Sequence, residues 1–96
     1  MAKPRSRAAQ FRTVLNLLAI LGEPVRVVIV QRLSKGPAAA GDLAKQLPVS
    51  RTAVVQHLKR LEGAGLVTAS TEGRRRLYRL SSEGFAPLAR WLEHFA

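Results

Sequence analysis

The residues of this sequence best suited to chemistry are two groups of basic side chains, and that chemistry is non-covalent binding of phosphate groups. The first group follows Ser50 at helical spacing and mixes basic with small polar side chains. Its members are Ser50, Arg51, Thr52, Val55, Gln56, Lys59 and Arg60. The second group is a run of three arginines, Arg74, Arg75 and Arg76. Because no acidic residue lies within either group, the pattern predicts a surface that binds double-stranded DNA.

Several side chains of the first group have the chemistry to read bases in a major groove. The Gln56 amide can make paired hydrogen bonds to adenine, and the Arg51 guanidinium can do the same to guanine. Thr52 and Val55 can contact a thymine methyl group. Ser50 is expected to cap the helix that carries these residues, which places them beside the positive end of its dipole.

The remaining cations are expected to bind phosphates rather than bases. Lys59 and Arg60 lie further along the same helix, where phosphate contacts would position the protein without reading sequence. Arg74, Arg75 and Arg76 form the tip of a predicted hairpin, suited to a minor groove or its flanking phosphates. The alternative is a solvated turn. The hairpin lies directly after a capped basic helix in a chain of net charge +10, which favours DNA binding over a solvated turn.

Metal binding and catalysis have little support among the residues. The chain has no Cys and two His. His57 lies beside the inner stripe of its helix and is expected to be a packed boundary residue with one hydrogen bond; a phosphate contact and a metal are the alternatives. His94 and Glu93 point about 100° apart on a helix, so together with Glu83 they converge poorly on an ion. With no nucleophile–base pair or carboxylate dyad, the sequence predicts a non-enzyme without metal or cofactor.

Length and charge set the class of protein. Ninety-six residues suffice for one small domain. Sixteen Lys and Arg against six Asp and Glu give a pI near 11.7, which makes nucleic acid the leading partner. No stretch approaches the roughly 20 apolar residues of a membrane span, and the basic N-terminus is not followed by the apolar run of a signal peptide. We therefore expect a cytoplasmic protein with no membrane partner.

The elements that hold these residues follow from apolar spacing and from helix-ending signals. Helices are expected over 8–21, 24–35, 40–47 and 50–63, then strands over 66–71 and 76–81 and a last helix from about 82. Pro48 ends the third helix by forcing Leu47 out of helical geometry. The order predicts a mainly α fold with a small β-hairpin (α+β), a winged helix-turn-helix of about five helices plus a two-stranded wing. Residues 1–7 are expected to form a basic flexible arm, and 8–96 the DNA-binding and dimerisation domain.

Apolar residues recur every three or four positions on the expected helices. The stripes are Phe11, Val14, Leu15, Leu18 and Leu21 in the first helix, Val25, Val28, Ile29 and Leu33 in the second, and Val54, Leu58 and Leu61 in the fourth. The first and last helices carry an apolar surplus, namely Phe11, Leu15, Leu18, Leu88, Trp91, Leu92 and Phe95. A two-fold dimer would bury it and space two recognition helices roughly 34 Å apart on a pseudo-palindromic site. The alternative is a module that docks another protein and binds DNA weakly or non-specifically.

Several short motifs resemble the ArsR/SmtB family of bacterial repressors over residues 8–96. They are Leu21-Gly-Glu-Pro-Val-Arg26, Gly41-Asp-Leu-Ala44, Val49-Ser50, Gln56-His-Leu-Lys59, Gly63-Ala-Gly-Leu-Val67 and Glu72-Gly-Arg74. The resemblance implies a homodimer with both terminal helices in its interface, a recognition helix beginning at Ser50 and a wing around Arg74. It also implies transcriptional repression relieved by an inducer.

Two departures from the family pattern qualify what the resemblance implies. Metal-sensing members carry a Cys-x-Cys pair where this chain has Ala39 and Gly41, and the metal-ligand pattern of the last helix is missing. We therefore expect a cysteine-free member that senses no metal, with an unknown small-molecule inducer; a response to an organic ligand is the alternative. Pro48 stands where the family's turn has Gly, so the turn before the recognition helix must be built differently.

Overall fold

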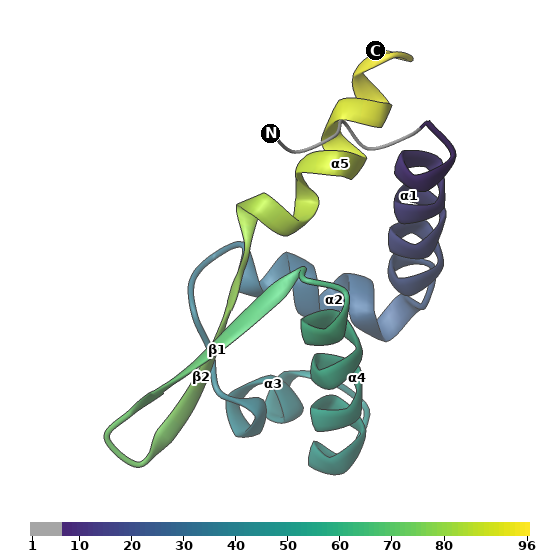
Figure 1. The fold of residues 1–96 in the computed structure, drawn as a ribbon. Helices are drawn as coiled ribbons and strands as arrows, with labels where there is room; N and C mark the ends of the chain where they lie inside the picture. The colour runs from purple at the N-terminus through teal and green to yellow at the C-terminus, as the bar shows by residue number, and fades with distance from the viewer. Residues whose placement is uncertain (1–6) are drawn as a thin grey trace.

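The computed structural model describes residues 7–96, which form five helices and one antiparallel hairpin (Figure 1). The elements in chain order are α1 (Arg7–Leu21), α2 (Pro24–Leu33), α3 (Ala40–Gln46), α4 (Arg51–Gly63), β1 (Val67–Glu72), β2 (Arg75–Leu80) and α5 (Ser82–Glu93). This order confirms the predicted winged helix-turn-helix. The predicted basic arm, residues 1–7, lies outside the described residues except for Arg7, with which α1 begins.

The start of α2 follows the capping signal in the sequence. The Glu23 carboxylate accepts a hydrogen bond from the backbone N–H of Arg26 at 2.9 Å, and Pro24 takes the first helical position. The helix ends at Leu33, two residues before the predicted end. The turn that follows passes through Gly36 at φ 142°, a backbone conformation that favours glycine.

The turn between α3 and α4 is built around Pro48. Leu47, which precedes it, is extended, with φ −123° and ψ 146°, so α3 ends one residue earlier than expected. The chain re-enters a helix through Ser50, whose hydroxyl accepts a hydrogen bond from the backbone N–H of Ala53 at 3.1 Å. The predicted cap of the fourth helix is therefore confirmed.

The core is centred on α4. Its inner residues Val54, Leu58 and Leu61 are fully buried, as predicted. The other buried apolar residues come from every remaining element and include Val14, Leu17, Ile29, Leu33, Leu43, Leu66, Val67, Tyr78 and Leu88. The prediction that Val28 faces the core is wrong, since its side chain is 42% exposed. Because α2 is apolar on several sides, spacing alone does not select the buried face.

α1 has two apolar faces with different surroundings. Val14 and Leu17 enter the core, whereas Phe11, Leu15 and Leu18 are exposed. Leu17 was outside the predicted stripe, because apolar residues on both sides of the helix make the inward face ambiguous. No single helix in residues 7–96 has the length and apolar composition of a membrane span. Only α1 and α2 taken together have both, and the two helices are bent by 95° relative to each other.

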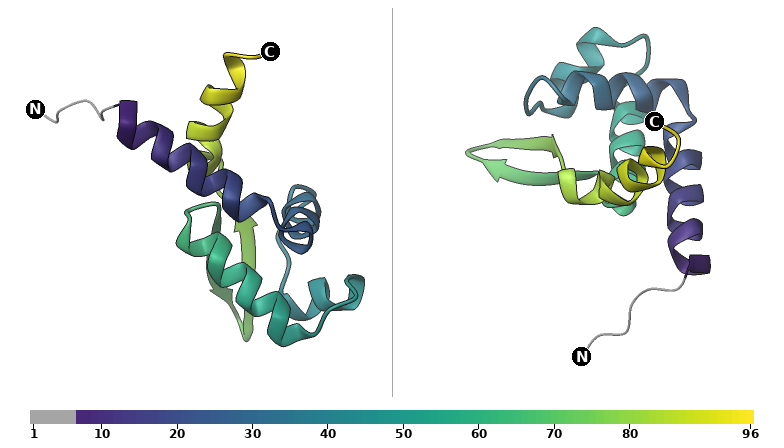
Figure 2. Two further views of the ribbon diagram at one scale, coloured as in Figure 1. Left: turned by 90° about the vertical axis from the view of Figure 1, so that its right-hand side faces the viewer. Right: turned by 90° about the horizontal axis from the view of Figure 1, so that it is seen from above.

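The hairpin projects away from the helices (Figure 2). β1 and β2 pair in antiparallel register from Val67 opposite Leu80 to Glu72 opposite Arg75. Gly73, at φ 64°, opens the two-residue turn at the tip. We call the hairpin and its turn, residues 67–80, the wing.

The base of the wing is hydrogen-bonded to the segment between α2 and α3. The backbone N–H of Ala38 donates to the Tyr78 carbonyl at 3.0 Å, and the N–H of Tyr78 donates to the Ala38 carbonyl at 2.9 Å. This bridge was not predicted, because one isolated residue pair carries no sequence periodicity. It joins the wing to the helix-turn-helix unit through the backbone.

α5 begins against the turn that follows α4. The hydroxyl of Ser81 caps the helix by accepting a hydrogen bond from the backbone N–H of Gly84 at 3.3 Å. A Cβ atom at Gly84 would overlap with the carbonyl oxygen of Gly65. The two backbones therefore meet directly, and α5 then continues beside α1, with which it makes contact.

Candidate nucleic-acid interface

The outer side of α4 is open to solvent along its length. Arg51, Thr52, Gln56 and Lys59 are exposed and Val55 is half-buried. We call these five residues the reading face. Because the opposite side of α4 is fixed in the core, the reading face is held at a constant orientation. Its residues lie where a helix in a major groove presents them to base edges.

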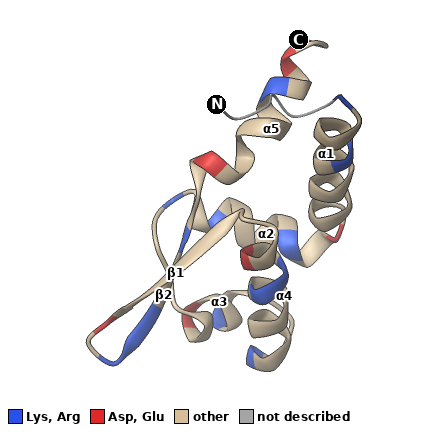
Figure 3. Cartoon of the chain, in the orientation of Figure 1, with Lys and Arg blue, Asp and Glu red and all other residues tan. Residues whose placement is uncertain are grey.

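A basic groove separates α4 from the wing. It has a volume of about 720 Å³ and is lined by Ala39, Ala40, Gly41, Asp42, Lys45, Arg51, Val55, Lys59, Arg74, Arg75, Arg76 and Tyr78. We call it the wing groove. Six of its side chains are basic and one is acidic, and Figure 3 shows basic residues on α3, on α4 and near the hairpin tip. A cleft lined by one sign of charge concentrates the field that attracts phosphates.

The wing groove brings together part of the predicted contact set. Arg51, Val55 and Lys59 of the reading face lie in it together with three arginines of the wing, Arg74, Arg75 and Arg76. The remaining predicted residues, Ser50, Thr52, Gln56 and Arg60, lie outside its lining and are exposed.

Six residues that line the wing groove were outside the predicted contact set, namely Ala39, Ala40, Gly41, Asp42, Lys45 and Tyr78. Two of them bear directly on the basic side chains. Lys45 lines the groove from α3, and Gly41 lies beside the Arg51 side chain. A Cβ atom at Gly41 would be 3.9 Å from the guanidinium carbon of Arg51, so the guanidinium rests against α3. Lys45 could have been found from its positive charge on the helix before the recognition helix. The place of Gly41 beside Arg51 depends on tertiary packing, for which the sequence has no signal.

The four arginines of the wing differ in their surroundings, and Arg79 lies 3.8 Å from the Glu72 carboxylate, between Nη2 and Oε2. Arg75 pairs with the Asp42 carboxylate. Arg76 lies 3.7 Å from the Glu62 carboxylate, between Nη2 and Oε2, and its guanidinium carbon is 5.8 Å from the centre of the Tyr78 ring. Arg74 has no ion-pair partner within residues 7–96. The wing therefore carries one cation that no carboxylate of the described chain neutralises.

His57 joins α4 to the start of α2. Its Nδ1 lies 3.3 Å from Nη1 of Arg26 and 3.7 Å from Oε2 of Glu23. A guanidinium nitrogen can only donate and a carboxylate oxygen can only accept, so the contact with Arg26 uses an unprotonated Nδ1 and the contact with Glu23 a protonated one. The half-buried ring with one hydrogen bond matches the predicted boundary histidine. Within residues 7–96, no three His, Cys, Asp or Glu side chains gather closely enough to hold a metal ion.

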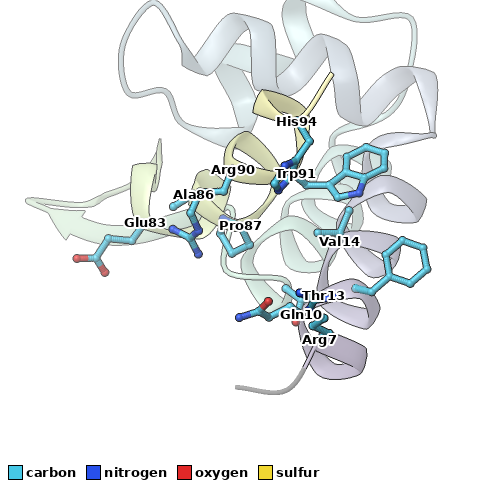
Figure 4. A pocket seen from close by; sticks show the side chains of 11 residues that line it. Arg7, Gln10, Thr13, Val14, Glu83, Ala86, Pro87, Arg90, Trp91 and His94 are labelled. Carbon is cyan, nitrogen blue, oxygen red and sulfur yellow. The ribbon is translucent and has the colours of Figure 1, made fainter. Parts of the chain in front are cut away.

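A second groove lies between α1 and α5, with a volume of about 1040 Å³ (Figure 4). Its apolar side chains include Phe11, Val14, Pro87 and Trp91. Large apolar residues are exposed in this groove and beyond it: Phe11 at 52%, Leu15 at 48% and Leu18 at 38% on α1, Leu92 at 49% on α5, and Phe95 at 72% after the end of α5. Trp91 is half-buried and meets the Phe95 ring edge-on, with centroids 5.0 Å apart. We call the exposed apolar residues of α1 and of the C-terminal part of the chain the terminal apolar face.

Leu88 does not belong to the terminal apolar face. It was predicted with the surplus apolar residues, but it is 8% exposed and packs in the core of the single chain. Leu88 lies on the same apolar stripe of α5 as Leu92, one turn nearer the start of the helix, where the stripe closes the core. The expectation that it is free for a second subunit is therefore corrected.

A short helix, a turn, a capped helix with an exposed basic side, and a cationic hairpin together define a winged helix-turn-helix DNA-binding protein. The helix-turn-helix domain family matches residues 21–68, from the end of α1 to the first residues of β1. The match thus includes the whole of the reading face.

Comparisons with individual proteins agree with this class. The HTH-type transcriptional regulator Rv2034 of Mycobacterium tuberculosis is 49% identical over 75 residues, which are 78% of this chain and 70% of that protein. The HTH-type transcriptional repressor SmtB of the same species is 41% identical over 71 residues, 74% of this chain and 53% of the repressor, so the chain spans about half of SmtB. A solved ArsR-like transcriptional regulator from Rhodococcus sp. RHA1 superposes with a TM-score of 0.78 at 33% identity, over 88% of this chain and 80% of that one.

The chain belongs to the ArsR/SmtB family of DNA-binding transcriptional regulators. The resemblance found in its sequence motifs is thereby confirmed, and so is membership without any cysteine. The relatives are named as regulators of transcription rather than as enzymes.

Proposed function

We propose that this protein is a homodimeric transcriptional repressor that binds a pseudo-palindromic operator without a metal sensor site. The observation that carries the proposal is the wing groove, in which α3, α4 and the wing bring six basic side chains to one surface. A surface of this kind binds the phosphates of a duplex while α4 lies in its major groove. Residues 8–96 then serve both DNA binding and dimerisation.

The reading face supplies the proposed sequence readout. Gln56 is exposed and pairs with adenine, while Arg51, resting against Gly41, pairs with guanine. Thr52 and Val55 add contacts to thymine methyl groups.

Phosphate contacts fix the position of the protein on the duplex. We assign them to exposed side chains at the two ends of the surface, namely Ser50, Lys59 and Arg60 at α4 and Arg74 on the wing, while Arg75 and Arg76 lie beside Arg74 and are paired with carboxylates. Within the wing, Arg74 has the strongest claim because no carboxylate of residues 7–96 pairs with it.

The proposed dimer forms through the terminal apolar face. Phe11, Leu15 and Leu18 on α1, Leu92 on α5 and Phe95 just after α5 are large apolar residues that a single chain leaves exposed. A contiguous apolar patch of this kind is rare on a protein that stays monomeric. A two-fold contact buries the terminal apolar face of both subunits. It also gives the two reading faces the spacing of successive major grooves.

We propose that the protein has no metal sensor at α3. The positions that hold a Cys-x-Cys pair in metal-sensing members are Ala39 and Gly41 in this chain, and neither has a side-chain atom that ligates a metal. An inducer of this repressor would then bind elsewhere in the dimer, and an organic molecule is the alternative that remains.

The test is a titration of duplexes by fluorescence anisotropy, with the protein's own promoter compared with a scrambled sequence of equal length. We expect tighter binding to one promoter segment and an affinity that falls steeply with salt. Sedimentation velocity of the free protein is expected to show a dimer. Equal affinity for both duplexes would refute sequence-specific repression. A monomer that assembles only with a foreign protein would favour an interaction module instead.

A further inference from the structure

Asp42 is the one carboxylate among the residues that line the wing groove. It pairs with Arg75 of β2 from its position on α3. Arg76, the next residue, lies 3.7 Å from Glu62 on α4. Both arginines line the wing groove. The wing is therefore connected to α3 through Arg75 and to α4 through Arg76.

These two ion pairs also reduce the positive charge that the wing offers to DNA. Arg75 and Arg76 each face a carboxylate, whereas Arg74 faces none within residues 7–96. Arg74 also lies beside Gly73 in the turn at the tip of the hairpin, where the wing extends furthest from the helices (Figure 1). An unpaired Asp42 in the same groove would repel phosphates, so Arg75 neutralises it as well.

We propose that Asp42 is a positioning residue for DNA binding. It holds Arg75 and, together with the pair between Glu62 and Arg76, aims the wing so that Arg74 carries the phosphate contact of the wing. This inference rests on the proposed function, because it assigns roles within the same DNA-binding surface. Both members of the Asp42–Arg75 pair are exposed, at 42% and 60% of their side chains, so the pair adds little to folding stability and acts on direction and charge.

The test is the salt dependence of DNA affinity for the wild type, Arg74→Gln, Asp42→Asn and the double variant Asp42→Asn/Arg75→Gln. The double variant removes the ion pair and leaves the net charge unchanged. We expect it to keep the wild-type slope of log affinity against log salt, and to lose about two- to fivefold in affinity. Arg74→Gln is expected to lower the magnitude of the slope by about 0.9 per protomer. Asp42→Asn alone is expected to steepen it by up to about the same amount, because Arg75 is released to phosphate.

Either of two outcomes would overturn the assignment. If the slope of the double variant falls as far as that of Arg74→Gln, Arg75 contacts phosphate in the complex and Asp42 is only its partner in the free protein. An Asp42→Asn slope equal to that of the wild type would equally contradict the release of Arg75.

Hydrogen exchange of the free protein separates this inference from the proposed function. Amide exchange at residues 72–76 is expected to be faster in Asp42→Asn and in the double variant than in the wild type, with Arg74→Gln as the matched control that keeps the pair. Equal rates in all four proteins would overturn the restraint of the wing. Absence of salt-dependent DNA binding in the wild type would overturn the proposed function and the role of Arg74, while the exchange rates would still decide whether Asp42 restrains the wing.

Discussion

Replacing Gln56 with alanine tests whether α4 reads bases. The Gln56 side chain is exposed and makes no hydrogen bond within residues 7–96, and alanine is a good helix former. The free energy of unfolding is therefore expected to change by less than about 0.5 kcal/mol. A paired amide–adenine contact is worth about 1–3 kcal/mol, and a dimer on two half-sites loses it twice, about 2–6 kcal/mol. The expected loss of operator affinity is about 30-fold to about 10⁴-fold.

The assay compares the operator with a scrambled duplex at one salt concentration. The operator is first obtained by selecting bound duplexes from a randomised pool. Gln56→Ala is expected to lose affinity for the operator while its affinity for the scrambled duplex stays the same, and its own selected sites should lose one adenine preference per half-site. Arg74→Gln is the matched control, since a phosphate contact weakens both duplexes alike. Equal losses of Gln56→Ala on both duplexes would refute base reading by this residue.

Three further predictions concern the elements that hold the interface. Gly84→Ala is expected to lower the free energy of unfolding in urea by at least about 2 kcal/mol, because its Cβ would overlap with a backbone oxygen, while Gly63→Ala, which faces open space, stays near the wild type; equal midpoints would contradict the close contact. Ser50→Ala and Ser81→Ala should each lower the free energy of unfolding by about 1 kcal/mol, because each removes a helix cap. Only Ser50→Ala should weaken DNA binding, and equal losses of DNA affinity in the two variants would refute a place for Ser50 in the interface. Leu15→Asp should give a monomer in sedimentation velocity that keeps the helical content of the wild type, since Leu15 is 48% exposed in the single chain; a persistent dimer would exclude this part of α1 from the subunit contact.

The order and the ends of the elements could be predicted because local residues determine them. Pro48 and Ser50 end one helix and start the next through backbone geometry and one hydrogen bond, whatever the rest of the chain does. The buried face of α4 was also predictable, since its apolar residues form one stripe beside a polar side.

The faces of the remaining helices depend on neighbours that are distant in sequence. α1 and α2 are apolar on several sides, so periodicity did not exclude Val28 from the core or select Leu17 for it. Leu88 was assigned to a subunit interface because periodicity does not show how far along the apolar stripe of α5 the core extends.

The pairing of wing and helices was equally beyond local signals. Asp42 and Arg75 are 33 residues apart, and the bridge between Ala38 and Tyr78 joins segments 40 residues apart in sequence. Composition showed that the wing is basic. Which arginines remain free to meet a phosphate was decided by the tertiary structure.

The contact between Gly84 and Gly65 bears on how the two functions of the chain communicate. Most neighbouring elements in a protein are separated by side chains, whose rotamers can absorb small displacements. Here the first turn of α5 rests on the backbone just after α4, with no side chain between them. In the proposed dimer, a displacement of α5 by a change at the subunit contact would be passed to the end of α4 as a rigid-body shift. An effector that alters the spacing of the two proposed subunits would then reach the DNA through this backbone contact, without binding near the bases.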